Sequence, residues 1–85
     1  MMRKNGITFE ELRELLLELG FSESSPQPYR IRFEHRATET VLLFRAYNSD
    51  ETVNDRELVV VRRQLVDNGL IEAPAFDRFL AKASA

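Results

Sequence analysis

The segment PYRIRFEHRATETVLLFRAY, residues 28–47, alternates apolar and polar side chains on both sides of a short polar stretch. A period of two is typical of strands that are buried on one face, so the segment predicts an antiparallel hairpin turning near Thr38-Glu39. Burial of one face determines the register, because a slip of one residue would expose Phe44 and bury Arg45. We therefore expect Phe33 to lie opposite Phe44. The predicted core face carries Ile31, Phe33, Leu42, Phe44 and Ala46, and the predicted open face carries Arg30, Arg32, Arg36, Arg45 and Tyr47 with Glu34, Val41 and Leu43.

An amphipathic helix is predicted before the hairpin. Thr8 can cap its first turn and Glu11 can return the hydrogen bond, which together form a capping box. Gly20 is expected to end the helix, since glycine enters the left-handed conformation without steric cost. Apolar side chains recur at helical spacing on one stripe, namely Phe9, Leu12, Leu15, Leu16 and Leu19.

Two further helices are predicted after the hairpin. The first has Asn54 as N-cap, Glu57 to complete a second capping box, and Gly69 as its stop. The β-branched run Val59-Val60-Val61 would suit a strand, but the caps at both ends favour a helix. A short C-terminal helix is predicted from Pro74. The expected buried residues are Leu58, Val61, Leu65 and Val66 in the first helix and Phe76, Phe79 and Leu80 in the second.

The predicted fold class is α+β. The expected order is a helix, a two- or three-stranded antiparallel sheet, a helix and a short C-terminal helix, with the helices packed on one sheet face. Residues 22–28, SESSPQP, have the composition of a loop, and their two prolines leave room only for a very short edge strand. A chain of 85 residues can close one core, so residues 1–85 are predicted to form a single domain.

The composition excludes several classes of protein. Hydrophobic residues make up 44% and charged residues 31%, which is ordinary for a globular domain. Without cysteine and with a single histidine, the chain predicts no disulfide, no metal site and no cofactor. The basic start lacks the apolar run of a secretory signal, and no apolar run is long enough to span a membrane. The expected location is therefore the cytoplasm, with no membrane partner.

The charge distribution points to the predicted open face. Net charge is -2, yet residues 28–47 carry four arginines against two glutamates. Arginines on alternate strand residues project to one side and could hold phosphates, while Tyr47 offers a plane for base stacking. The alternative is a solvated face, or one covered by a protein partner, because arginine stems also shield apolar neighbours such as Val41 and Leu43.

Catalytic and metal-binding arrangements are weaker in the sequence. His35 lies on the core-facing side near the predicted turn and is the one candidate for general acid–base catalysis, against a structural role beside the turn. Glu10, Glu14 and Glu18 recur every four residues, which is the spacing of a solvated helix face on which Arg13 can pair with one of them. No glycine-rich phosphate loop and no Ser-His-Asp set can be drawn.

Three stretches resemble the HicA-type toxins of bacterial toxin–antitoxin pairs. Residues 12–21, LRELLLELGF, resemble the opening helix of that family and its Gly-Phe stop. Residues 62–71, RRQLVDNGLI, resemble the end of its second helix, and residues 73–80, APAFDRFL, resemble the tail helix of many members. The resemblance covers most of the chain. It implies a fold similar to a double-stranded-RNA-binding domain, mRNA cleavage by a histidine, and inhibition by a partner antitoxin.

The sequence departs from this family at the catalytic position. The family's histidine lies in a Gly-Ser-His motif that opens the central strand, where this chain reads Pro28-Tyr29-Arg30. His35 lies several residues further along and on the other side of the strand from Arg30. The resemblance therefore implies a HicA-like domain that has lost cleavage.

Three functions are consistent with these patterns. The first is a non-catalytic HicA-like domain that binds RNA weakly through Arg30, Arg32, Arg36, Arg45 and Tyr47. The second is a protein–protein interaction module, with an antitoxin-like partner or a second copy of the chain on the same face or on Val59-Val60. The third is an endoribonuclease toxin that uses His35.

Overall fold

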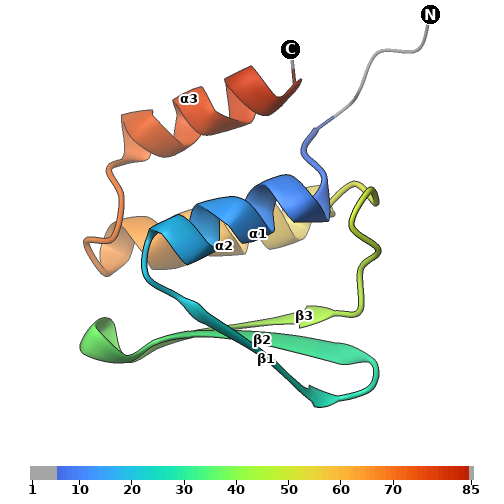
Figure 1. Ribbon diagram of the computed structural model, residues 1–85. Coiled ribbons are helices and arrows are strands. Elements are labelled where there is room, and N and C mark those ends of the chain that lie inside the picture. The colour runs from blue at the N-terminus through green and yellow to red at the C-terminus, as the bar shows by residue number, and fades with distance from the viewer. Residues whose placement is uncertain (1–5, 85) are drawn as a thin grey trace, which may run out of the picture.

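The computed structural model describes residues 6–84, apart from the side chains of residues 26, 83 and 84. Figure 1 shows the chain from the N-terminal helix to the C-terminal helix. The elements follow one another as α1 (Phe9–Glu18), β1 (Ser22–Gln27), β2 (Arg30–His35), the 3-10 turn η1 (Arg36–Thr38), β3 (Thr40–Arg45), α2 (Asp55–Asp67) and α3 (Ala73–Ser84). The predicted α+β class and element order are confirmed.

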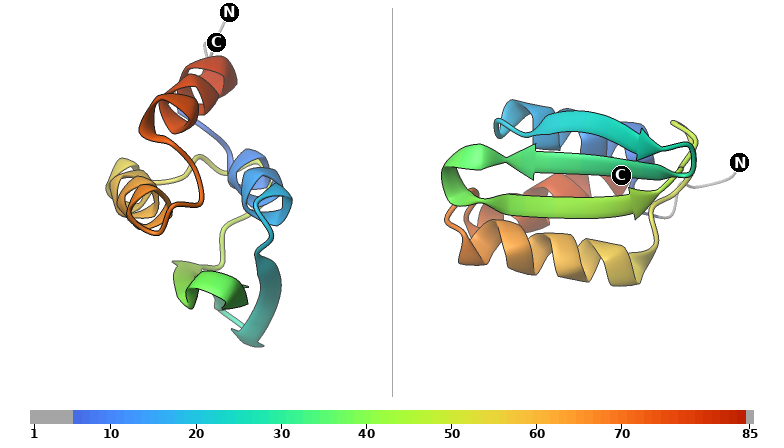
Figure 2. Two further views of the ribbon diagram at one scale, coloured as in Figure 1. Left: turned by 90° about the vertical axis from the view of Figure 1, so that its left-hand side faces the viewer. Right: turned by 90° about the horizontal axis from the view of Figure 1, so that it is seen from below.

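The elements form three layers. The sheet has the strand order β1-β2-β3, so that β2 is central and β1 and β3 are its edges. Helices α1 and α2 lie on one face of the sheet, and α3 lies on the far side of these two helices (Figure 1 and the left view of Figure 2). The helices are thus on one side of the sheet, but only α1 and α2 form the layer next to it.

The capping box predicted for α1 is present. The Thr8 N–H donates to Glu11 Oε1 at 2.8 Å, and the Glu11 N–H donates to Thr8 Oγ1 at 3.3 Å. The connection between β3 and α2 adds a second cap, because the Phe9 N–H donates to the Glu51 carbonyl at 2.8 Å and the Glu10 N–H to the Ser49 carbonyl at 3.0 Å. These bonds satisfy N–H groups that have no partner inside a helix.

Glycine ends α1 and α2, as predicted, whereas the C-terminal helix, predicted to be short, has 12 residues and is longer than α1. Gly20 has a φ of 101°, and the following Phe21 N–H donates to the Leu16 carbonyl at 3.0 Å. Gly69 has a φ of 72°, and the Leu70 N–H donates to the Leu65 carbonyl at 2.9 Å. Both arrangements have the hydrogen bond of a Schellman motif, which requires a left-handed residue at the glycine position.

The β2–β3 hairpin has the predicted faces and a different register. Phe33 lies opposite Leu42 and not Phe44, a shift of two residues, because residues 36–39 form the turn. The left-handed Glu39, with a φ of 55°, closes this turn. A shift of two preserves the alternation, so Ile31, Phe33, Leu42 and Phe44 all face the helices as expected, whereas Ala46 follows the end of the strand and is exposed.

The expectation that residues 22–28 form mainly a loop was wrong. Ser22–Gln27 is a six-residue strand that pairs with β2 through Ser22, Glu23, Ser24 and Gln27. The pairing is irregular between Ser24 and Gln27, where Pro26 brings no N–H donor. Composition misled here because an edge strand needs partners on one side only, which tolerates a proline beside a bulge.

A single cluster of buried side chains joins the layers. It comprises Ile7, Phe9, Leu12, Leu16, Phe21, Phe33, Leu42, Phe44, Tyr47, Val53, Leu58, Val61, Leu65 and Phe76. Phe9, Phe33 and Phe44 contact one another at ring-centroid distances of 5.7 to 6.2 Å. Phe76 from α3 is fully buried, as predicted, and fastens the outer layer to the rest of the core.

Candidate functional site

The predicted arginine face is less uniform than its sequence suggested. Arg30 and Arg32 alternate with core residues and project from the open face. Arg45 follows the same alternation, but its guanidinium lies over the Tyr47 ring, and Arg36 lies in the turn η1 and not on a strand. Arg32 pairs with Glu34 at 3.6 Å, and Arg45 pairs with Glu51. Among residues 6–84, only part of this positive charge is therefore left without a carboxylate partner, at Arg30 and Arg36.

The prediction that Tyr47 lies on the open face was wrong. Its side chain is 7% exposed and belongs to the core. The ring stacks on Phe9 at 5.3 Å, and the Arg45 guanidinium covers it at 3.8 Å. Because β3 ends at Arg45, strand alternation no longer sets the direction of Tyr47, and the ring turns toward the helices. It presents no free plane to a nucleic-acid base.

The Tyr47 hydroxyl instead joins β3 to the start of α2. It accepts a hydrogen bond from the Asn54 N–H at 3.1 Å and donates one to Glu57 Oε1 at 3.0 Å. The capping box predicted between Asn54 and Glu57 is therefore absent. The Tyr47 hydroxyl lies between the Asn54 N–H and the Glu57 carboxylate instead. The other Glu57 oxygen, Oε2, is buried without a hydrogen-bond partner in the part of the chain that the structure describes.

Tyr47→Phe is expected to lower the free energy of unfolding by about 1–3 kcal/mol, because the Asn54 N–H and the Glu57 carboxylate lose the hydroxyl between them. Chemical denaturation of the variant measures this change. Tyr29→Phe is the matched control, since Tyr29 is 64% exposed, and it should change stability by less than about 0.5 kcal/mol. Equal effects of the two variants would contradict the bridging role.

His35 supports the turn between β2 and β3. Its Nδ1 lies 2.9 Å from Thr38 Oγ1, which in turn lies 2.7 Å from Thr40 Oγ1. The imidazole packs on the Phe21 ring at a centroid distance of 5.3 Å. Among residues 6–84, no carboxylate forms a hydrogen bond or ion pair with this histidine, so the geometry is that of a turn-stabilising residue.

Arg13 connects the acidic stripe of α1 to the sheet through ion pairs. Arg13 contacts Glu10 at 3.6 Å, and it contacts Glu23 of β1 at 2.5 Å. Glu14 and Glu18 border a depression of about 330 Å³ between α1 and α3, whose other lining residues include Leu15, Phe79 and Lys82. Within residues 6–84, no group of three acidic, histidine or cysteine side chains is placed to hold a metal ion.

Two surface ion pairs make part of the stability dependent on pH. Hydrogen bonds from Arg45 and from the Asn48 N–H lower the pKa of Glu51 below its ordinary value of 4.5, and a hydrogen bond from Arg62 lowers the pKa of Asp77 below 3.8. A carboxylate whose pKa is lower in the folded state stabilises the protein above its unfolded-state pKa. This contribution is lost as the pH falls through the folded-state pKa.

Asp77→Asn is therefore expected to be destabilising at neutral pH and without effect well below pH 3.8, where Asp77 is protonated in both states. Urea titrations of the parent and the variant at the two pH values measure the difference. Asp50→Asn serves as the control, because Asp50 is exposed and has no ion pair with any described residue. A deficit of Asp77→Asn that persisted unchanged in acid would contradict the pairing with Arg62.

A groove between β3 and α2 lies beside exposed apolar side chains. Four of the six large apolar side chains that are exposed within residues 6–84 lie on these two elements: Val41 (39% exposed), Leu43 (56%), Val59 (60%) and Val60 (56%). The groove measures about 260 Å³. Its lining includes Val41, Leu43 and Phe44 from β3 and Arg56, Val60 and Gln64 from α2, and these define the β3/α2 groove.

The backbone of β3 is open along this groove. The Ala46 N–H donates to the Tyr29 carbonyl at 3.0 Å, which fixes the phase of the antiparallel ladder between β2 and β3. The alternation of such a ladder directs the N–H and C=O groups of Leu42 and Phe44 toward β2 and those of Val41 and Leu43 away from it. Sequence reasoning noted the exposed valines of α2 but missed that they adjoin a free strand edge.

Comparisons with protein-family models, with curated proteins and with solved structures gave no significant match. The fold and surface together define a small α+β domain with one charged sheet face and one apolar edge. None of the helices within residues 6–84 combines the length and apolar character needed to cross a membrane.

Proposed function

We propose that the chain is a protein-interaction domain whose contact surface is the β3/α2 groove and the neighbouring Val59. The observation that carries the proposal is the gathering of exposed Val41, Leu43, Val59 and Val60 on one edge of the molecule. Isolated apolar side chains are common on protein surfaces, but a contiguous group beside unpaired strand backbone favours a binding site.

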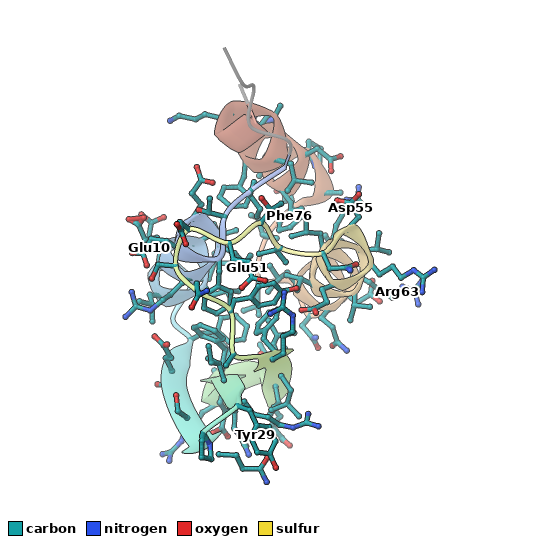
Figure 3. All side chains as sticks on the ribbon, turned by 90° about the vertical axis from the view of Figure 1, so that its right-hand side faces the viewer. Glu10, Tyr29, Glu51, Asp55, Arg63 and Phe76 are labelled. Carbon is teal, nitrogen blue, oxygen red and sulfur yellow. The ribbon has the colours of Figure 1, made fainter. Side chains whose placement is uncertain are left out.

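Site-specific photo-crosslinking in the native cells tests this proposal. A benzophenone amino acid at position 60 should give discrete covalent adducts with a partner protein, because Val60 lines the groove. The same group at position 10 is the control, since Glu10 lies on α1, on the opposite side of the molecule from α2 (Figure 3). Leu43→Glu should abolish the position-60 adducts. An absence of adducts at position 60, or equal yields at both positions, would refute the proposal.

A HicA-like architecture is compatible with this function. The order of helix, three antiparallel strands and helix supports the resemblance, and a domain that once served a toxin–antitoxin pair would already possess a protein partner. Pro28-Tyr29-Arg30 stands where the family carries its catalytic motif, at the turn into β2. We therefore propose a non-catalytic domain.

RNA contact through the open sheet face is the second candidate, favoured by a different observation. Arg30 and Arg36 make no ion pair with any described residue, and the exposed Tyr29 lines a shallow depression together with Arg30. Tyr29 stands at the outer end of the sheet, away from the helices (Figure 3), where a base could stack on it.

Titration of the isotope-labelled protein with a short mixed-sequence RNA tests this second candidate. Shifts of the amides near Arg30 and Arg36 that fade with salt would support it, since contacts to phosphate release counterions. The double variant Arg30→Gln/Arg36→Gln should remove them, whereas Arg63→Gln should not. An unchanged spectrum at low salt would exclude RNA as the ligand.

A further inference from the structure

Building on the interaction function proposed above, we infer that the β3/α2 groove binds one extended segment of a partner protein as an added strand. The segment would carry apolar side chains at alternate positions and an acidic side chain beside Arg56. Its backbone would pair with the outward-facing groups of Val41 and Leu43.

The first support is the contrast between the two edges of the sheet. The β1 edge contains Pro26 and an irregular pairing between Ser24 and Gln27, both of which hinder a further strand. The β3 edge has neither of these features. Thr40–Arg45 pairs with β2 at every position without a shift, and its sequence contains no proline. Of the two edges, only β3 is fitted to accept another strand.

The second support is the position of α2. In the view from below, α2 lies beyond β3, outside the edge of the sheet, and the end-on view agrees (Figure 2). A strand added to β3 would therefore run beneath α2, with alternate side chains directed toward it. Val60 and Val61 of α2 line the groove there, so those side chains are expected to be apolar.

The same position of α2 selects the kind of partner. A second copy of the chain that paired its own β3 about a two-fold axis would bring its α2 onto the same side of the joined sheet. Each helix overhangs the neighbouring strand (Figure 2), so the two helices would compete for the same space. A single extended segment has no such helix and fits the groove.

Charge indicates the composition of one end of the segment. Arg56 lines the groove in the first turn of α2 and has no ion pair with any described residue, whereas the neighbouring Glu57, which also lines the groove, accepts a hydrogen bond from Tyr47. At the other end, the α2 side chain that lines the groove is the neutral Gln64. A carboxylate on the partner would therefore find its complement at Arg56, which also sets the direction of the segment.

A phage-displayed library of random dodecapeptides, selected on the full chain, tests the inference. Enriched peptides should show apolar residues at alternate positions with an acidic residue at one end. Synthetic versions should bind with measurable affinity by fluorescence anisotropy and should not bind Val60→Glu. Arg56→Gln should weaken the binding of these peptides, and Arg78→Gln, on an exposed position of α3, should leave it unchanged.

Backbone pairing is tested separately from side-chain contact. In the synthetic peptide, alternate backbone nitrogens would face β3. Methylation of these nitrogens should weaken binding by about tenfold or more, because the N–H groups can no longer donate. On the protein, Leu43→Pro removes an outward N–H while sparing the ladder with β2, and Leu43→Ala removes the side chain alone. Leu43→Pro should weaken peptide binding more than Leu43→Ala does.

The outcomes separate the inference from the function on which it rests. Binding that ignores nitrogen methylation but is lost in Val60→Glu would overturn strand addition and leave the interaction surface standing. Enrichment of no peptide would overturn the extended-segment partner, while the crosslinking at position 60 still decides the interaction function. Should Leu43→Pro fail to fold, the methylated peptides alone decide the matter.

Discussion

Phe33→Ala is expected to lower the free energy of unfolding by about 3–5 kcal/mol. Phe33 lies in the central strand and is fully buried. Its ring contacts Phe9 of α1 at a centroid distance of 6.2 Å and Phe44 of β3 at 5.8 Å. Truncation removes contacts to both layers at once, and the paired β2 backbone limits how far the neighbours can close the cavity.

Leu43→Ala is the matched control for this variant. Leu43 lies in the same sheet on the opposite face and is 56% exposed, so its truncation should cost less than about 0.5 kcal/mol. Urea denaturation followed by circular dichroism measures both. A loss from Phe33→Ala no larger than that from Leu43→Ala would show that the core is not centred on β2.

Phe76→Ala is expected to detach α3 while the remaining layers stay folded. Phe76 is the fully buried side chain of α3, and it points toward the space between α1 and α2 (Figure 3). An exposed ion pair also connects this helix to α2, between Arg62 and Asp77 at 2.9 Å. Phe79 and Leu80 are only partly buried against the core, so without the Phe76 ring the outer layer loses its most deeply buried contact.

Hydrogen exchange measures this detachment. Amides of residues 76–82 should exchange about 100-fold faster or more in Phe76→Ala, because docking of the helix loses the free energy of a buried aromatic side chain. Amides of β2 should keep most of their protection. Arg78→Ala, on an exposed position of the same helix, should leave both sets unchanged. Equal acceleration throughout the chain would instead mean that α3 unfolds only with the whole domain.

Local signals in the sequence were sufficient for the helices and for the faces of the sheet. Thr8 and Glu11 lie three residues apart, and Gly20 and Gly69 require only their own backbone conformation, so nearby residues determine these features. The alternation around Phe33 also survives any even shift of the strands. These features could therefore be predicted without knowledge of the tertiary structure.

Features that depend on distant partners could not be predicted in this way. The register of Phe33 depends on the length of the turn at residues 36–39, which the alternation does not specify. Tyr47 is buried because Phe9 and Asn54 meet it in three dimensions. The β3/α2 groove arises from the lateral position of a helix relative to a strand, and no short stretch of sequence encodes that position.

The second cap of α1 has a consequence for how the chain folds as it is synthesised. The carbonyls of Ser49 and Glu51 receive the Phe9 and Glu10 N–H groups, although some 40 residues separate the two segments. The opening helix therefore leaves the ribosome with its first turn incompletely satisfied, and it acquires its last hydrogen bonds only after the whole sheet has emerged. Such late closure raises the contact order of a small domain. It makes the first and middle thirds of the chain interdependent, so that a nascent chain ending at β3 would lack the partner that completes its own first helix.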